Sequence, residues 1–238
     1  MHTVCKYLAK DRTMTKFLHH SLDPSSRLIR LMCAEYGVSL EMEQVSPWKR
    51  EDSFMSVSPA GTLPVMMEDG SVPIVGALAT IHYVERQFAP NNVAGLVPAE
   101  PALQAEMWRL LEWILFKLND EVTRYVLEEK IGKRERKSGS PETSVLRAAK
   151  VNLGEHLLYF DWILGARTWT AGSEMSLSDF ALAAHLSTLD YLGDMDWPST
   201  GPTRDFYARM KSRPAFRPLL ADRLSALPAS AHYADLDF

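Results

Sequence analysis

The pattern of apolar and polar residues in the N-terminal part of the chain predicts a small α/β unit. Apolar residues recur every three or four positions after residue 26 and stop at Gly37, which predicts a helix with Ser25 or Ser26 as its N-cap. Residues 38–45 alternate in the manner of a strand with one buried face. The predicted elements are, in order, a strand at 17–20, this helix, the strand at 38–45, an irregular segment from 47 that can hold a short helix, a hairpin at 63–75 and a helix at 76–88.

The rest of the chain shows helical spacing only. Residues 89–101 are rich in Pro, Asn, Gly and Ala, which predicts a linker, and residues 103–130 predict one long amphipathic helix. Further helices are expected up to about 164, at 178–192, at 203–212 and from 215. The predicted units are an N-terminal extension at 1–15, an α/β domain at 16–88, the linker at 89–101, an all-helical domain at 102–227 and a tail at 228–238.

Composition narrows the class of protein. The chain has 238 residues, 46% apolar and 24% charged, so it can bury a sizeable core and is not expected to be disordered. Its 30 acidic and 26 basic residues provide no general attraction to nucleic acid or anionic lipid. No apolar run approaches the length of a membrane span. Cys5 and Cys33 cannot build a disulfide framework, and no Cys/His cluster has zinc spacing. We expect a reduced, cytosolic protein without a metal or cofactor.

The first thirteen residues call for a separate interpretation. They carry Lys6, Lys10 and Arg12 but neither a long apolar core nor a small-residue cleavage site, so they do not form a secretory signal. A second methionine, Met14, stands just before the first predicted strand. We interpret the segment as an upstream start or an expression remnant without function.

Three motifs carry a resemblance to a known family. They are SPAGTLPV at 58–65, SLSDF at 176–180 and MKSRPA at 210–215. In this order and at these spacings they resemble the cytosolic glutathione transferase superfamily over about residues 16–227. The resemblance implies an α/β, thioredoxin-like N-terminal domain, an all-α C-terminal domain, a cis-proline at Pro64 that turns the preceding backbone toward a peptide ligand, and a capping box formed by Ser176 and Asp179.

The resemblance also locates the catalytic position, and the residue there opposes catalysis. Aligning residues 26–30 with the family's helix start puts Asp23 where a catalytic Ser or Cys is expected. An ionised aspartate repels a thiolate and cannot donate a hydrogen bond to it. Ser21 or Ser25 could substitute after a register shift, although turn and cap chemistry also explains both.

A second departure from the family lies at the start of the helix after the hairpin. The family presents Glu/Asp-Ser there to hold the γ-glutamyl group of glutathione, and this chain has Gly76 and Ala77. Neither side chain can hydrogen-bond, and each charged hydrogen bond lost is worth about 1–3 kcal/mol. We predict weak or absent glutathione binding and no catalytic residue.

Other chemistry finds little support. The chain lacks the dinucleotide, P-loop, nucleophile-elbow and zinc-protease motifs. His19 and His20 are neighbours in a strand, so they point to opposite faces and are interpreted as structural. For the aromatic residues at helical spacing, core packing is favoured over a ligand site; they are Trp108, Trp113, Phe116 and Trp162.

Three surface features remain for a partner. Trp48 lies in a charged irregular segment, where it would either anchor an interface with a partner or fill the local core, and the sequence favours neither role. The basic run 130–137 is interpreted as a solvated helix end. The alternative is an electrostatic docking site for an acidic partner. The tail alternates aromatic or aliphatic residues with acids, and it either folds back or presents a recognition surface. We expect its last residues to matter more for partner binding than for folding; they are Asp235, Leu236, Asp237 and Phe238.

These features resemble one branch of the superfamily, bacterial cell-division proteins that bind the tubulin-like filament protein FtsZ. That resemblance implies a cytoplasmic homodimer at the division site that curves or bundles FtsZ filaments and promotes constriction. The dimer is expected to pair the α/β domain of one subunit with the long helices of the other, because residues 103–118 carry an apolar surplus. The alternatives are a glutathione-dependent transferase or isomerase with an atypical site, and a stress-type protein that binds hydrophobic ligands in its cleft.

Overall fold

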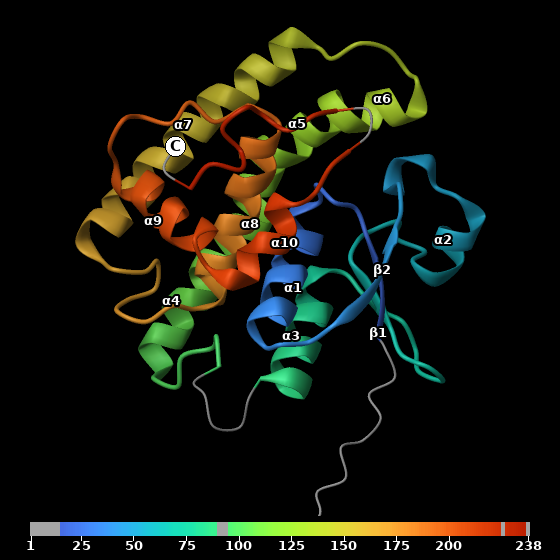
Figure 1. Ribbon diagram of the computed structural model, residues 1–238, viewed down its shortest axis with the longest axis horizontal. Coiled ribbons are helices and arrows are strands. Elements are labelled where there is room, and N and C mark those ends of the chain that lie inside the picture. The colour runs from blue at the N-terminus through green and yellow to red at the C-terminus, as the bar shows by residue number, and fades with distance from the viewer. Residues whose placement is uncertain (1–14, 90–94, 225–226, 237–238) are drawn as a thin grey trace, which may run out of the picture.

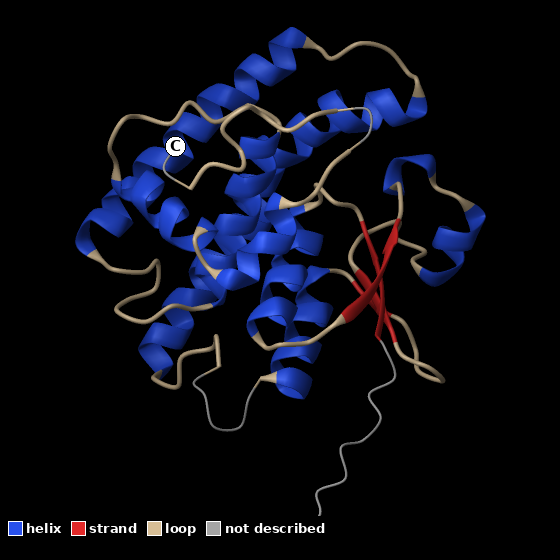
Figure 2. Cartoon of the chain, viewed as in Figure 1, coloured by secondary structure: helices blue, strands red, loops and turns tan. Residues whose placement is uncertain are grey.

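The computed structural model describes residues 15–89, 95–224 and 227–236. Residues 1–14 of the predicted extension, part of the predicted linker, and Asp237 and Phe238 of the tail lie outside these described residues. A small sheet with its helices and a larger group of helices lie side by side (Figures 1 and 2).

A four-stranded mixed sheet forms the centre of the smaller unit (Figure 2). Its strands are β1 (Thr15–His19), β2 (Leu40–Gln44), β3 (Val65–Met67) and β4 (Ile74–Val75). They lie in the order β2-β1-β3-β4, with β1 and β2 parallel and the other pairs antiparallel. A parallel pair needs a crossover connection, which helix α1 (Pro24–Glu35) supplies. The predicted β-α-β and β-β-α order is therefore confirmed.

Helices cover both faces of this sheet (Figure 1). Side chains alternate along β1, so Phe17 joins the core formed with α1 and α3 (Ala77–Phe88), while Leu18 packs in a cluster with Phe54. Phe54 lies on α2 (Asp52–Val57), which follows the short 3₁₀ turn η1 (Pro47–Lys49). Strand β2 is one of the two edge strands of this sheet, and its Met42 is 46% exposed, so the expectation of a buried face at this position is wrong.

The start of α1 differs from its prediction. The N-cap is Asp23, whose carboxylate accepts the Ser26 amide hydrogen, and neither Ser25 nor Ser26 is the cap. Pro24 explains the shift, because its fixed φ and missing N–H suit the first helical position. The helix ends as predicted at Gly37, where φ is +68°.

One nearly continuous helix opens the larger unit. It comprises α4 (Pro101–Glu112), the π-helical stretch η2 (Trp113–Thr123), α5 (Arg124–Leu127), the π-helical stretch η3 (Glu128–Gly132) and α6 (Lys133–Arg136). The long amphipathic helix is thus confirmed, although its periodicity gave no sign of the π-helical stretches. The helices that follow are α7 (Thr143–Ala166), α8 (Leu177–Tyr191), α9 (Pro202–Lys211), the 3₁₀ turn η4 (Pro214–Phe216) and α10 (Arg217–Leu220).

Helix α8 is the centre of the molecule, because all of its residues are buried. It packs against α1 of the smaller unit and against α4 of its own. Its first turn has the predicted capping box, in which the Asp179 carboxylate accepts the Ser176 amide hydrogen at 2.8 Å. The Leu63–Pro64 peptide bond is cis, as the resemblance implied.

The expectation that the aromatic set packs in the core is wrong for three of its members. Trp108 is 40% exposed, Phe116 48% and Trp162 69%. Trp113 is half-buried and stacks on Tyr159, with 4.5 Å between ring centroids. The three exposed rings lie on α4 (Trp108), η2 (Phe116) and α7 (Trp162), on faces of these helices that no other element covers fully.

Candidate functional site

A cleft of about 370 Å³ lies where the two units meet. The start of α1, the η1 turn and the residues before cis-Pro64 contribute its lining from the smaller unit, with Asp23, Ser25, Trp48 and Leu63 among them. The long helix contributes the opposite wall, where the lining includes Arg124, Leu127 and Glu128. The wall from the long helix begins within η2 and runs into η3, so the π-helical stretches shape it.

Asp23 is occupied by its role as a helix cap. One of its oxygens, Oδ2, accepts hydrogen bonds from the Ser26 amide at 2.7 Å and the Ser26 hydroxyl at 2.6 Å. Burial raises the pKa of Asp23, and the two hydrogen bonds from Ser26 oppose that shift. A carboxylate held in this way accepts hydrogen bonds and cannot stabilise a thiolate.

The two serines considered as substitutes differ in position. Ser21 donates its hydroxyl hydrogen to Gln44 Oε1 at 2.9 Å, which ties the end of β1 to β2. Ser25 is half-buried and lines the cleft. Of the two hydroxyl groups, the one on Ser25 is therefore placed to meet a cleft ligand.

The start of α3 presents only backbone at its N-cap. Gly76 adopts φ +89° and ψ 161°, and its amide donates a hydrogen bond to the Pro64 carbonyl at 2.9 Å. The Gly76 carbonyl accepts from the amide and the hydroxyl of Thr80. Space is open around a Cβ at this position, but the positive φ favours glycine over any residue with a side chain. Ala77 packs against the core and offers no polar group.

Trp48 packs locally while also lining the cleft. Its ring meets His20 edge-on, with 5.1 Å between centroids, and it lies against Gly132 of the long helix. A Cβ at Gly132 would stand 2.7 Å from Trp48 Cδ1, so only glycine fits there without movement. Sequence reasoning missed this pair; the available signal was a glycine within a helical pattern.

Of the two neighbouring histidines, His20 connects the smaller unit to the long helix. His20 Nδ1 accepts the Leu22 amide hydrogen at 3.2 Å, and His20 Nε2 lies 3.3 Å from Glu135 Oε1 on α6. The Ser46 hydroxyl also binds Glu135. Burial, with the nearby Arg30 charge, lowers the pKa of His19 to about 4. Within the described ranges, no group of three or more His, Cys, Asp or Glu residues is placed to hold a metal ion.

The tail is docked up to Tyr233, where the two units meet, and exposed beyond it. Tyr233 is 1% exposed, and its hydroxyl donates to the Leu219 carbonyl at 3.0 Å. His232 Nε2 lies 3.0 Å from the buried carboxylate of Asp190. Asp235 is exposed and Leu236 is 45% exposed, whereas Asp237 and Phe238 lie outside the described residues. The tail as far as Tyr233 therefore folds back on the molecule, which is one of the two alternatives that the sequence left open.

The basic run at the end of the long helix is largely neutralised. Lys130 pairs with Asp194 at 2.7 Å and Lys133 with Glu129 at 2.6 Å. Arg136 pairs with Glu128. Cations at a helix C-terminus also complement its dipole, which agrees with the solvated-helix-end interpretation. In the described ranges, no helix is long and apolar enough to cross a membrane.

Comparison with known proteins identifies the class. Residues 24–87 match the family described as "Glutathione S-transferase, N-terminal domain". Together with the fold and the whole-chain relatives below, this shows that the chain belongs to the glutathione S-transferase superfamily.

Within that superfamily the chain is similar to particular proteins over nearly its whole length. It is 40% identical to FtsZ-localized protein A of Caulobacter vibrioides over 95% of this chain and 100% of that protein. The structure of FzlA from C. crescentus superposes with a TM-score of 0.88 at 38% identity, covering 95% and 100% of the two chains. A glutathione S-transferase from Sinorhizobium meliloti 1021 gives a TM-score of 0.89 at 39% identity with the same coverage.

Proposed function

We propose that this protein is a non-catalytic homodimer of the glutathione S-transferase fold that binds FtsZ filaments in the cytoplasm at the division site. There it alters filament curvature or bundling and promotes constriction. The similarity that supports this proposal extends along the whole chain to a protein named for its localization with FtsZ. Members of one superfamily carry different functions on one fold, so the site must also be considered.

The proposal that the protein is non-catalytic rests on the residues found at the cleft positions where the family activates and binds glutathione. The Asp23 carboxylate stands at the position expected for the residue that activates the thiol, but it caps α1 instead. Gly76 has no side chain to hold the amine of glutathione. A transferase lowers the pKa of a bound thiol through a hydrogen-bond donor, and Asp23 is an acceptor when ionised. The chain lacks both the group that activates the thiol and the side chains that bind glutathione. This favours a role in partner binding over catalysis.

A homodimer suits filament binding for a physical reason. Two symmetric copies of one site can engage neighbouring subunits or filaments, which raises avidity without stronger single contacts. We assign the contacts to Trp48 and to the tail at 228–238, with Asp235, Leu236, Asp237 and Phe238 as its partner-facing residues. The exposure of Asp235 and Leu236 beyond the anchored Tyr233 supports this assignment. The α/β domain at 16–88 and the helical domain at 102–227 form the framework.

Co-sedimentation tests the proposal. Purified FtsZ from the same organism is polymerised with GTP, and the protein is expected in the pellet with the filaments and in the supernatant when GDP replaces GTP. Negative-stain microscopy of the same samples should show filaments that are more curved or more bundled.

One observation favours a second candidate. The Ser25 hydroxyl in the cleft could serve a glutathione-dependent transferase or isomerase. Glutathione-dependent turnover of a standard aryl halide, abolished by Ser25→Ala, together with no pelleting on FtsZ, would establish that activity in place of filament binding.

A further inference from the structure

A small apolar cluster lies between the tail and the cleft. We call it the tail–cleft cluster, and its members are Leu22, Leu127, Ile131, Tyr191 and Tyr233. None of them is more than 6% exposed. Trp48 packs against the cluster from the cleft side. The cluster therefore connects segments that belong to separate features of the surface.

Each segment in the cluster has a defined position relative to the cleft. Leu22 immediately precedes Asp23, and Leu127 itself lines the cleft. Tyr233 comes from the tail, two residues before the exposed Asp235. Because buried side chains are packed at near-crystalline density, a change in one member is felt by the others.

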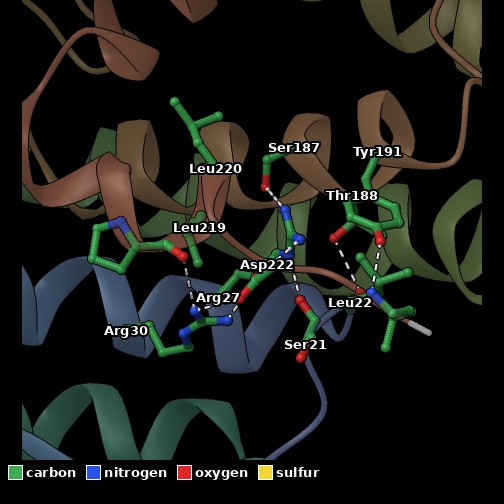
Figure 3. Close-up of polar contacts among 12 residues, drawn as sticks. Ser21, Leu22, Arg27, Arg30, Ser187, Thr188, Tyr191, Leu219, Leu220 and Asp222 are labelled. Atoms are coloured by element: carbon green, nitrogen blue, oxygen red, sulfur yellow. Dashed lines mark hydrogen bonds and ion pairs between the residues drawn. The ribbon is translucent and has the colours of Figure 1, made fainter. Parts of the chain in front are cut away.

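A polar chain follows the same route. The Tyr233 hydroxyl accepts a hydrogen bond from Arg27 Nη1 at 2.9 Å. The same guanidinium donates through Nε to the Ser21 carbonyl at 2.6 Å and through Nη1 to the Ser187 hydroxyl at 2.8 Å, as Figure 3 shows. Arg27 is fully buried, so each of these bonds matters to its position. The tail is thus tied through Arg27 to the turn that precedes Asp23.

We propose that Tyr233 is a positioning residue that couples the C-terminal tail to the cleft. A partner that draws the tail away from the tail–cleft cluster changes the cleft at Leu127 and Trp48, and occupation of the cleft changes how readily the tail moves. This reciprocity is a requirement of linked equilibria. Its meaning for filament binding rests on the proposed function, but the coupling itself is a property of the isolated chain.

Fluorine NMR on the full chain tests the coupling. The protein is labelled with 5-fluorotryptophan, which gives one signal for each of its 6 tryptophans, and Trp48→Phe identifies the signal of Trp48. Tyr233→Phe keeps the ring and removes the hydroxyl. We expect it to shift the Trp48 signal and to leave unchanged the signal of Trp162, which is 69% exposed on α7. Amide hydrogen exchange in residues 20–28 should accelerate at least about tenfold, the effect of one hydrogen bond to a charged group.

Tyr36→Phe is the matched control. The Tyr36 hydroxyl also makes two hydrogen bonds, donating to Glu85 at 2.5 Å and accepting from the Leu96 amide at 3.1 Å, but at the opposite end of α1. It should destabilise the fold by a comparable amount without moving the Trp48 signal. An unchanged Trp48 signal in Tyr233→Phe, or an equal shift in both variants, would overturn the coupling. A shift confined to Tyr233→Phe supports it even if FtsZ does not bind.

Discussion

Arg30 and Asp222 form a two-point ion pair across the junction of the two units. Arg30 Nη1 lies 2.9 Å from Asp222 Oδ2, and Nη2 lies 2.8 Å from Oδ1. Arg27 Nη2 reaches the same carboxylate at 3.3 Å, so one aspartate compensates two guanidinium groups that project from α1 (Figure 3). The Arg27 side chain is 0% exposed and that of Arg30 4%. The segment after α10 is in this way fastened to the first helix of the fold.

Removing that carboxylate should be severely destabilising. Asp222→Ala leaves two buried cations without their counter-ion, and breaking a buried pair from one side costs about 3–5 kcal/mol. Denaturant unfolding followed by circular dichroism measures the loss. Asp205→Ala is the control, because its side chain is 61% exposed, and it should change the unfolding free energy by less than about 0.5 kcal/mol. Equal losses of unfolding free energy in the two variants would contradict the importance assigned to the ion pair of Asp222 with Arg30 and Arg27.

Acid should weaken the fold through His185. Burial, with the nearby His156, lowers the pKa of His185 to about 3 from an ordinary value of 6.5. Between these values the unfolded chain binds a proton that the folded chain does not, so the free energy of unfolding falls as the pH drops from 6.5 toward 3. Each pKa unit is worth about 1.4 kcal/mol. His185→Asn, measured across that range, should flatten the profile; an unchanged slope would assign the acid sensitivity to other groups.

Glutathione should bind weakly or not at all. Calorimetric titration is expected to give no dissociation constant at or below about 1 mM, which corresponds to about −4 kcal/mol. Restoring the family's pair by Gly76→Glu with Ala77→Ser faces an obstacle, because Gly76 has a φ of +89°. Ala77→Ser alone avoids that strain and should raise affinity by less than tenfold while Asp23 remains. Millimolar or tighter binding to the unmodified chain would count against the non-catalytic proposal.

Self-association should depend on the outer face of α4. Trp108 is 40% exposed there, and Trp108→Glu places a charge in the dimer interface that we propose between the long helices and the α/β domain. We expect the dimer to weaken at least tenfold in analytical ultracentrifugation. Leu158→Glu, at a 65% exposed position on α7, should leave it unchanged. A monomer of 26.8 kDa at all concentrations of the unmodified chain would refute the dimer.

The exposed end of the tail should act in binding rather than in folding. Asp235→Lys or Asp237→Lys is expected to weaken FtsZ co-sedimentation in a salt-dependent way, and truncation of Leu236 and Phe238 should raise the off-rate. Unfolding should shift by less than about 1 kcal/mol. Glu41→Lys on the exposed edge strand β2 is the charge-reversal control.

Deletion of residues 232–238 cannot make that distinction. It removes Tyr233, which is 1% exposed, and should destabilise the fold. A Leu236 and Phe238 truncation that binds filaments normally would contradict the assignment of this surface.

Short-range patterns in the sequence were sufficient to predict the order of the helices and strands. Periodicity fixes which positions can share an apolar face, so the β-α-β and β-β-α order and the long helix followed from the sequence. The capping box at Ser176 and Asp179 spans only four residues, so it can be recognised in the sequence without a structure. Where a local rule failed, another local rule prevailed: Pro24 moved the cap of α1 to Asp23.

The tertiary structure alone decided which of these faces are covered and which distant groups meet. Helical spacing could not tell that Trp162 faces outward, because an apolar position is buried only if another element lies over it. The glycine at 132 acquires its meaning from Trp48, which approaches it from another unit. Arg27 and Tyr233 are separated by 206 positions, and no short-range pattern relates them. Their hydrogen bond exists because α1, α8 and the tail converge on one buried point, where a guanidinium cannot remain without partners.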